Sequence, residues 1–289
     1  MTPLHAAIFG GGRWARELAQ VAIQTLPEKS RLYLWSGDNP QSWKNWCNDI
    51  NPLKDISCHV SESRSDVLAN PKISHVLIAR SARRHFSTAY AALEAGKCVF
   101  VEKPFATNLN DAQVLSELAD RVSDAGESPA CITGLVFRYG RNLQVFASAC
   151  SKCGPVRGID LIWTDPKTEH RYGQEKSYDP SINVVLDVFP HAWSILRYFV
   201  RNTPMELTKV VVENGGQKVT LGLALGAVTA STTLVRNAKS RQRMVQVRGA
   251  GWSGHMDFSA EPGLASIDGR QVDVSTGFSS PLVGELQAE

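Results

Sequence analysis

The chain has 289 residues, of which 43% are hydrophobic and 20% are charged, and its formal net charge is +3. This length and composition predict a globular protein with a substantial core and two domains. The small net charge argues against nucleic acid as a partner. No apolar stretch is long enough to cross a bilayer, so we expect no membrane association.

The amino terminus shows no basic segment followed by a long apolar run, and no cleavage site. We therefore expect no secretory signal and a cytoplasmic location. Cys150 and Cys153 form a lone C-x-x-C, without a second such pair or paired histidines at zinc spacing. No metal site is expected.

Strands alternate with helices in the first half of the chain. Apolar runs predict strands at 4–9, 31–35, 73–79, 98–101 and 131–134, and amphipathic stretches predict helices at 14–24, 86–95 and 109–122. This alternation is typical of βαβ units, which form a doubly wound parallel sheet of the Rossmann type.

A glycine-rich segment follows the first predicted strand and opens the first predicted helix. It reads Gly10-Gly11-Gly12-Arg13-Trp14-Ala15 and matches G-x-G-x-x-A. In this setting Gly10 permits a tight turn, Gly12 lets the backbone approach a pyrophosphate, and Ala15 lets helix and strand pack closely. The helix N-terminus at Arg13 and Trp14 offers free N–H groups to phosphates. The segment therefore predicts a dinucleotide site.

The end of the second predicted strand bears on which dinucleotide binds. NAD-binding proteins usually carry an acid there that holds the ribose diol, and this chain has Ser36 instead. A hydroxyl tolerates a 2′-phosphate, and Arg13 could pair with that phosphate. Asp38, two residues further on, still offers a carboxylate to a ribose. We favour NADP as the cofactor and keep NAD as the alternative.

Glu102-Lys103-Pro104 directly follows the strand predicted at 98–101. This order places Lys103 at the carboxyl end of a parallel strand, where open α/β sheets bind ligands. A lysine there can donate to a substrate oxygen and stabilise the alkoxide that forms or collapses during hydride transfer. The alternative interpretation is an ordinary surface lysine.

Asp187 and His191 lie near the start of a helix predicted at 184–200. Their spacing of four places both side chains on one helix face. A carboxylate beside an imidazole raises its pKa towards neutrality and suits it to acid–base work. The alternative interpretation is a helix cap followed by a surface histidine.

The second half of the chain has a different pattern. Strands are predicted at 158–164, 210–213, 219–225, 228–235, 244–248 and 255–258, and the last five follow one another without helices between them. Consecutive strands of this kind pair most simply as an antiparallel sheet. We expect a Rossmann-type domain over residues 1–150 and an α+β domain with an open, mainly antiparallel sheet over residues 151–289. The boundary is expected near 149–155.

Together these segments resemble the Gfo/Idh/MocA oxidoreductase family, which includes glucose–fructose oxidoreductase and inositol dehydrogenase. The resemblance rests on the strand–GxGxxA start, the run 93–106 around Glu102-Lys103-Pro104 and the Asp187-x-x-x-His191 spacing, and it covers about residues 4–200. It implies hydride transfer between NAD(P) and a carbon of a sugar, cyclitol or related ketone, and a catalytic role for Lys103, Asp187 and His191. It also implies that Glu102 lies at the cofactor and that the C-terminal sheet serves for contacts in a homo-oligomer.

The chain departs from the family pattern in three places. The loop after 76–79 reads Arg80-Ser81-Ala82-Arg83-Arg84-His85 in place of a Thr-Pro-Pro-like loop. His85 matches the family histidine, and we expect Arg80 and His85 at the cofactor, with an acidic substrate or solvated loop charges as alternatives. Residues 181–186 replace the glycines that often precede the aspartate, which predicts a reshaped substrate pocket. Residues 281–289 look like the start of a helix that family members usually continue, so we expect either a naturally short second domain or a sequence that stops within it.

Two further groups are candidates for contact with the substrate or the nicotinamide. Arg138 and Tyr139 follow the sixth predicted strand and match a family position near the site. We predict that they bind the substrate, with a buried structural pair as the alternative. Trp163, His170 and Tyr172 lie where the second domain could cover the nicotinamide.

The leading prediction is an NAD(P)-dependent dehydrogenase or reductase that acts on a carbonyl or secondary alcohol carbon of a small polar substrate. Lys103 or His191 would supply the proton, and Asp187 would orient the histidine. One alternative is an NADPH-dependent imine or ene reductase of a biosynthetic intermediate. Another is a non-catalytic NADP-binding regulatory protein.

Overall fold

The computed structural model describes residues 2–37, 39–49, 56–123, 130–171, 174–175, 178–179, 181–275 and 281–288. The chain divides into two compact units. The first comprises residues 1–134 and 285–289, and the second comprises residues 135–284. Asp38 and Tyr172 lie outside the described residues, as does the side chain of His170.

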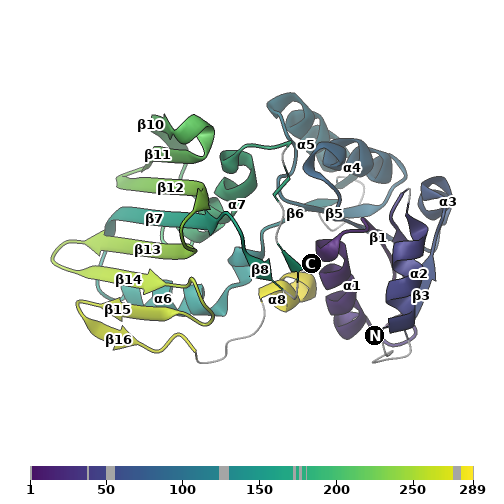
Figure 1. Ribbon diagram of the computed structural model, residues 1–289, viewed down its shortest axis with the longest axis horizontal. Coiled ribbons are helices and arrows are strands. Elements are labelled where there is room, and N and C mark those ends of the chain that lie inside the picture. The colour runs from purple at the N-terminus through teal and green to yellow at the C-terminus, as the bar shows by residue number, and fades with distance from the viewer. Residues whose placement is uncertain are drawn as a thin grey trace. The chain divides into compact units, whose positions relative to one another are not determined.

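The first unit contains a six-stranded sheet with the order β3-β2-β1-β4-β5-β6, and all its strands are parallel (Figure 1). The strands are β1 (His5–Phe9), β2 (Arg31–Trp35), β3 (Ser57–Val60), β4 (His75–Ile78), β5 (Cys98–Glu102) and β6 (Cys131–Gly134). The central strands are buried apolar runs, as expected for a sheet covered on both faces. The predicted Rossmann-type fold is confirmed.

Helices connect these strands. They are α1 (Arg13–Thr25), α2 (Pro40–Asp49), α3 (Arg64–Ala69), α4 (His85–Glu94) and α5 (Leu109–Ser123). Helix α1 buries Ala15, Leu18 and Ala22, a spacing that aligns them on one helix face. Helices α2 and α3 and strand β3 were not predicted from the sequence. In α2 the reason is that Trp43 is its one buried residue, so no apolar periodicity marks the helix.

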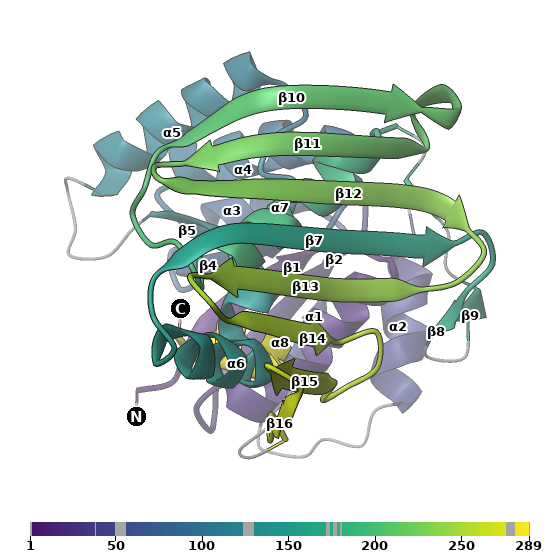
Figure 2. The same cartoon turned by 90° about the vertical axis from the view of Figure 1, so that its left-hand side faces the viewer.

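The second unit contains an eight-stranded sheet with the order β10-β11-β12-β7-β13-β14-β15-β16, seen face-on in Figure 2. The strands are β7 (Val156–Pro166), β10 (Met205–Glu213), β11 (Lys218–Leu225), β12 (Val228–Ala238), β13 (Gln242–Gly249), β14 (Ser253–Asp257), β15 (Leu264–Ile267) and β16 (Arg270–Val272). The pair β12–β7 is parallel and the other pairs of this sheet are antiparallel. The predicted mainly antiparallel sheet is confirmed. A separate two-stranded ladder joins β8 (His170–Arg171) to β9 (Gln174–Glu175).

The second unit begins at Leu135, earlier than the boundary expected near 149–155. The physical reason is helix α6 (Arg141–Ser151), which buries Leu143, Phe146 and Cys150 in the core of the second unit. Helix α7 (Val184–Leu196) packs on the same sheet and contacts β7, β11 and β12. Helix α8 (Pro281–Ala288) ends the described chain. No described helix is both long and apolar enough to span a bilayer.

Candidate active site

The glycine segment forms the turn between β1 and α1. A Cβ on Gly10 would lie 2.3 Å from the carbonyl oxygen of Ala79, and a Cβ on Gly11 would lie 2.7 Å from the Cβ of Ser36. Neither position accepts a side chain, because the turn passes directly against the ends of β4 and β2. The indole of Trp43 in α2 donates a hydrogen bond to the Gly10 carbonyl at 2.7 Å and holds the turn in place.

Gly12 is different, because it is exposed and a Cβ there would meet no atom within 4 Å. It is the N-cap of α1, makes no side-chain capping bond, and is followed by a first turn without acidic residues. The first N–H groups of the helix and the positive end of its dipole are therefore available to an anion. Open space above an uncapped helix start fits a dinucleotide pyrophosphate. Arg13, Trp14 and Ala15 form this first turn, and Ala15 is fully buried.

Ser36 follows β2 and lies against the glycine turn. Its hydroxyl donates to the Asn39 carbonyl at 2.6 Å, and the Asn39 side chain accepts from the backbone N–H of Ser42 at 3.1 Å. The Ser36 hydroxyl therefore closes the loop that leads into α2. Ser36 also brings no negative charge to the end of β2, where a carboxylate would repel a phosphate.

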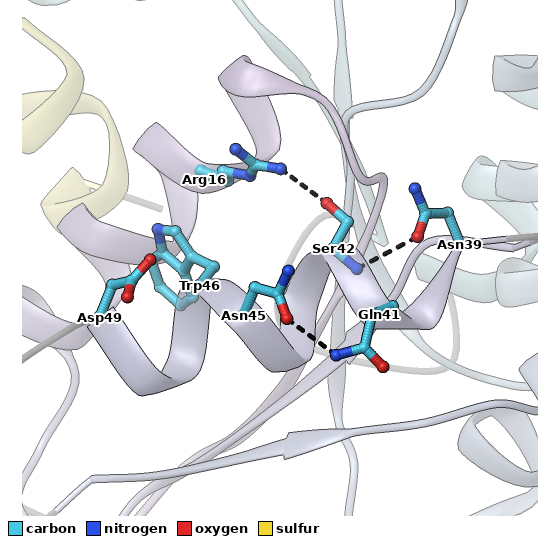
Figure 3. A pocket seen from close by; sticks show the side chains of 7 residues that line it. All are labelled: Arg16, Asn39, Gln41, Ser42, Asn45, Trp46 and Asp49. Carbon is cyan, nitrogen blue, oxygen red and sulfur yellow. Dashed lines mark hydrogen bonds between the residues drawn. The ribbon is translucent and has the colours of Figure 1, made fainter.

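A polar hollow of about 420 Å³ lies between α1 and α2 (Figure 3). Arg16 of α1 donates to the Ser42 hydroxyl at 2.6 Å, and Gln41 donates to Asn45 at 2.8 Å. The first bond joins α1 to α2, and the second lies within α2. The Arg16–Ser42 bond therefore helps to hold α2 beside α1. The residues that line it are Arg16, Asn39, Gln41, Ser42, Asn45, Trp46 and Asp49.

The loop after β4 carries Arg80 and His85. His85 is 1% exposed, and its Nδ1 and Nε2 lie 2.8 Å from the Pro104 carbonyl oxygen and 3.0 Å from the Arg80 carbonyl oxygen. The imidazole thus joins the arginine loop to the segment that follows β5. The guanidinium of Arg80 lies 4.7 Å from the centroid of the Trp35 ring. In contrast, Arg83 and Arg84 are exposed.

Glu102 ends β5 and is 7% exposed, and Lys103 follows it. The backbone N–H of Lys103 donates to the Glu102 carboxylate at 3.3 Å. Burial raises the pKa of Glu102 to about 7, while the Trp14 side chain and the Lys103 charge oppose the rise. Since β1, β4 and β5 are parallel, Lys103 lies at the same edge of the sheet as the glycine turn. The first unit therefore brings together the predicted residues of the glycine turn, Ser36, Arg80, His85, Glu102 and Lys103.

Asp187 and His191 lie on α7 in the second unit. The side chain of Asn183 caps this helix by accepting from the N–H of Leu186 at 2.9 Å, so Asp187 falls in the first turn. The Asp187 carboxylate accepts from the guanidinium of Arg236 in β12 at 2.7 Å. The sequence predicted His191 as the partner of this carboxylate and gave no indication of Arg236.

His191 lies against aromatic side chains. Its ring stacks on Trp163 of β7, with centroids 5.4 Å apart and an interplanar angle of 17°. Phe137 meets the His191 ring edge-on at 5.1 Å and the Trp163 ring at 5.3 Å. These contacts fix the plane of the imidazole. Phe137 belongs to the short η2 helix (Val136–Tyr139), in which Arg138 and Tyr139 were the residues predicted to bind the substrate.

A buried ion pair supports Trp163 from the neighbouring strand. Arg243 of β13 is the register partner of Trp163, and its guanidinium carbon lies 3.7 Å from the centroid of the indole. Arg243 is 1% exposed and pairs with Asp165, which is 2% exposed. The indole face attracts the cation, and the carboxylate neutralises a charge that would otherwise be buried without compensation. The sequence carried no signal for this unit, because strand register alone aligns Arg243 with Trp163.

Of the two predicted substrate residues, Arg138 is exposed and Tyr139 is partly exposed. The N–H of Arg138 donates to the Leu135 carbonyl at 2.7 Å and closes the η2 turn. Their predicted role in substrate binding stays a prediction. Among the described residues, no cluster of histidine, cysteine, aspartate or glutamate could hold a metal ion.

Residues 4–125 match the GFO_IDH_MocA family, described as an oxidoreductase family with an NAD-binding Rossmann fold. The chain is also 27% identical over 176 residues to YMR315W of Saccharomyces cerevisiae. That alignment covers 60% of this chain and 47% of the relative, so this chain matches about half the length of that protein.

Solved structures that are similar to nearly the whole chain include KijD10 and GnnA. KijD10, a 3-ketoreductase from Actinomadura kijaniata in complex with TDP-benzene and NADP, has a TM-score of 0.79 at 16% identity, with 99% of this chain and 88% of that chain covered. UDP-N-acetylglucosamine 3-dehydrogenase GnnA from Acidithiobacillus ferrooxidans has a TM-score of 0.74 at 17% identity, with the same coverage. At these identities the similarity shows a shared fold.

Proposed function

We propose that this chain, whose N-terminal domain belongs to the Gfo/Idh/MocA oxidoreductase family, is an NADP-dependent dehydrogenase or reductase. Its substrate class is a small polar molecule with a carbonyl or secondary alcohol carbon, such as a sugar or cyclitol. The 3-ketoreductase and 3-dehydrogenase activities of the two proteins with similar structures support this class.

One observation carries the proposal: the uncapped start of α1 and Lys103 lie at the same edge of one parallel sheet. The carboxyl edge of such a sheet is where α/β proteins bind dinucleotides. Gly12 leaves open space at the helix start, and Glu102 fixes the backbone N–H of Lys103. A ligand bound along this edge therefore meets both a phosphate site and an ammonium group.

The chain's own residues would then handle the proton and the developing charge. Lys103 donates to the substrate oxygen and stabilises the alkoxide. His191, held by Trp163 and Phe137, is the second candidate proton donor. Asp187, which pairs with Arg236, lies four residues before it on the same helix. When bound, a nicotinamide supplies or accepts the hydride.

Three other predictions remain part of the proposal. Arg138 and Tyr139 contact the substrate. The eight-stranded sheet makes a homo-oligomer contact. The protein works in the cytoplasm.

A thermal-shift comparison tests the proposal. NADPH and NADH would each be combined with sugars, cyclitols, sugar acids and imines, because a ligand that binds the native state alone raises apparent stability. We expect NADPH to raise the melting temperature and a keto sugar or cyclitol to raise it further. A further rise with imines alone would select an imine reductase. A rise with NADPH and with no substrate of the panel would favour a non-catalytic regulatory protein.

A further inference from the structure

The ends of β2 and β4 bring an arginine to the place where the ribose of the dinucleotide is expected. The guanidinium carbon of Arg80 lies 4.7 Å from the centroid of the Trp35 ring, at the end of β2. Its Nη2 lies 3.5 Å from the position that a Cβ on Gly37 would take. A positive charge from the loop after β4 therefore lies beside the residues that follow β2.

Several contacts hold Arg80 in this position. Its Nη1 donates to the hydroxyl of Thr88 at 3.3 Å, and its carbonyl oxygen lies 3.0 Å from Nε2 of His85. The Trp35 ring beneath it is 9% exposed and packs edge-on against Phe9 at 5.0 Å. Both the backbone and the head group of this arginine are thus fixed before any ligand binds, which reduces the entropy lost on binding.

Gly37 shapes the backbone beside this guanidinium. It has a φ of +80°, which favours glycine, and a Cβ there would lie in ordinary van der Waals contact with Arg80 Nη2. The preceding residue, Ser36, carries no charge at the position where an acid would bind the ribose diol. Arg64 adds a second guanidinium 6.0 Å from the centroid of the same Trp35 ring. The positive charge near the β2 end therefore comes from the loop after β4 and from the start of α3.

We propose that Arg80 binds the 2′-phosphate of NADP and is the residue that sets the preference for NADP over NAD. The inference rests on the proposed dinucleotide function and deepens it. A guanidinium matches the geometry of a phosphate with parallel N–H donors, and such charge-assisted bonds are strong. This assignment replaces Arg13 as the expected partner of the phosphate.

The test measures dissociation constants for NADPH and NADH by isothermal titration calorimetry on the full chain. We expect Arg80→Gln to weaken NADPH about 10- to 100-fold and to change NADH less than about twofold, because one charged hydrogen-bonding group is lost. Arg83→Gln is the matched control. It removes an exposed guanidinium from the same loop, and both affinities should stay as in the wild type.

Two further measurements separate a contact with the 2′-phosphate from other effects of the substitution. Arg80→Lys retains a charge but loses the planar donor pair, so it should fall between the wild type and Arg80→Gln for NADPH. The adenosine 2′,5′-bisphosphate fragment should lose affinity in Arg80→Gln as NADPH does, while adenosine 5′-diphosphate should not.

Equal weakening of NADPH and NADH in Arg80→Gln, with an unchanged melting temperature, would overturn the assignment and leave the proposed function standing. Equal effects of Arg80→Gln and Arg83→Gln would also overturn it. If the wild type bound neither dinucleotide, the proposed function itself would fail.

Discussion

The imidazole of His191 stacks on the indole of Trp163, with centroids 5.4 Å apart and planes inclined by 17°. The same indole carries the guanidinium of Arg243 at 3.7 Å, and Arg243 pairs with Asp165. A helix residue proposed to donate a proton therefore depends on two neighbouring strands for its orientation.

Replacing Trp163 by leucine removes the surface on which His191 stacks. We expect kcat to fall about 10- to 100-fold, because small misplacements of a catalytic group carry costs of this size. The dissociation constant for NADPH should not change, because Trp163 is 5% exposed and its ring lies against His191 and Arg243. Steady-state kinetics with the substrate found in the ligand panel measures the first quantity, and calorimetry measures the second.

Trp193→Leu is the control for the loss of an indole from the second unit, since Trp193 lies on α7 and stacks with Arg197 at 3.7 Å. This variant should keep most of its kcat. An unchanged kcat in Trp163→Leu would contradict the positioning role.

The pair Arg243–Asp165 is buried, so breaking it leaves an uncompensated charge in the core. We expect Asp165→Asn to lower the free energy of unfolding by about 3–5 kcal/mol. The double variant Arg243→Met with Asp165→Leu should recover most of this loss, because both charges are then absent. Urea denaturation measures the three free energies.

The partly exposed pair Arg241–Glu169 is the comparison, with side chains 26% and 12% exposed. Water reaches this pair more than it reaches Arg243–Asp165, so Arg241→Met should lower the free energy of unfolding by less than Asp165→Asn does. Equal costs at the two pairs would show that burial does not decide their energies.

Glu102 should make the first unit lose stability as the pH rises. Burial raises the pKa of its carboxyl to about 7, above the ordinary value in the unfolded chain. The stabilising contribution of the neutral form is therefore complete below the unfolded pKa and is lost as the pH rises through 7. Glu102→Gln should be more stable than the wild type at pH 8 by about 2–3 kcal/mol, and similar to it at pH 4.

Thermal unfolding across this pH range checks the expectation, with Glu94→Gln as an exposed control. A pH dependence that is the same in Glu102→Gln and in the wild type would assign the effect to other groups.

A substitution of Gly12 should weaken dinucleotide binding without changing the stability of the fold. A Cβ on Gly12 meets no atom within 4 Å, and its φ of −81° suits any residue, so Gly12→Ala should fold with an unchanged melting temperature. The added methyl would occupy the space above the start of α1, and NADPH affinity should fall at least about tenfold, or 1.4 kcal/mol. Unaltered NADPH binding would mean that no phosphate approaches this helix.

The sequence was sufficient for features that are local. Gly10, Gly12 and Lys103 are recognisable because a turn, a helix start and a strand end follow one another within a few residues. The alternation of strands and helices likewise predicted the parallel sheet, and consecutive strands predicted the antiparallel one.

Features that depend on register or on distant segments could not be predicted. Arg236 reaches Asp187 from β12, 49 residues along the chain. Arg243 meets Trp163 because β13 and β7 pair in one register. Trp43 anchors the glycine turn from a helix whose polar sequence shows no apolar face. In each case the partner is set by tertiary packing, which leaves no periodic pattern.

The most direct measurement of the central claim follows deuterium from NADPH labelled at the hydride position into the product, using the carbonyl substrate selected by the ligand panel. Mass spectrometry and NMR locate the label. We expect one deuterium on the former carbonyl carbon and a proton on the oxygen. Lys103→Met should slow this transfer at least about a hundredfold while it still binds NADPH. Binding of NADPH with no deuterium in any product of the carbonyl and imine panel would contradict the claim that the chain is an oxidoreductase.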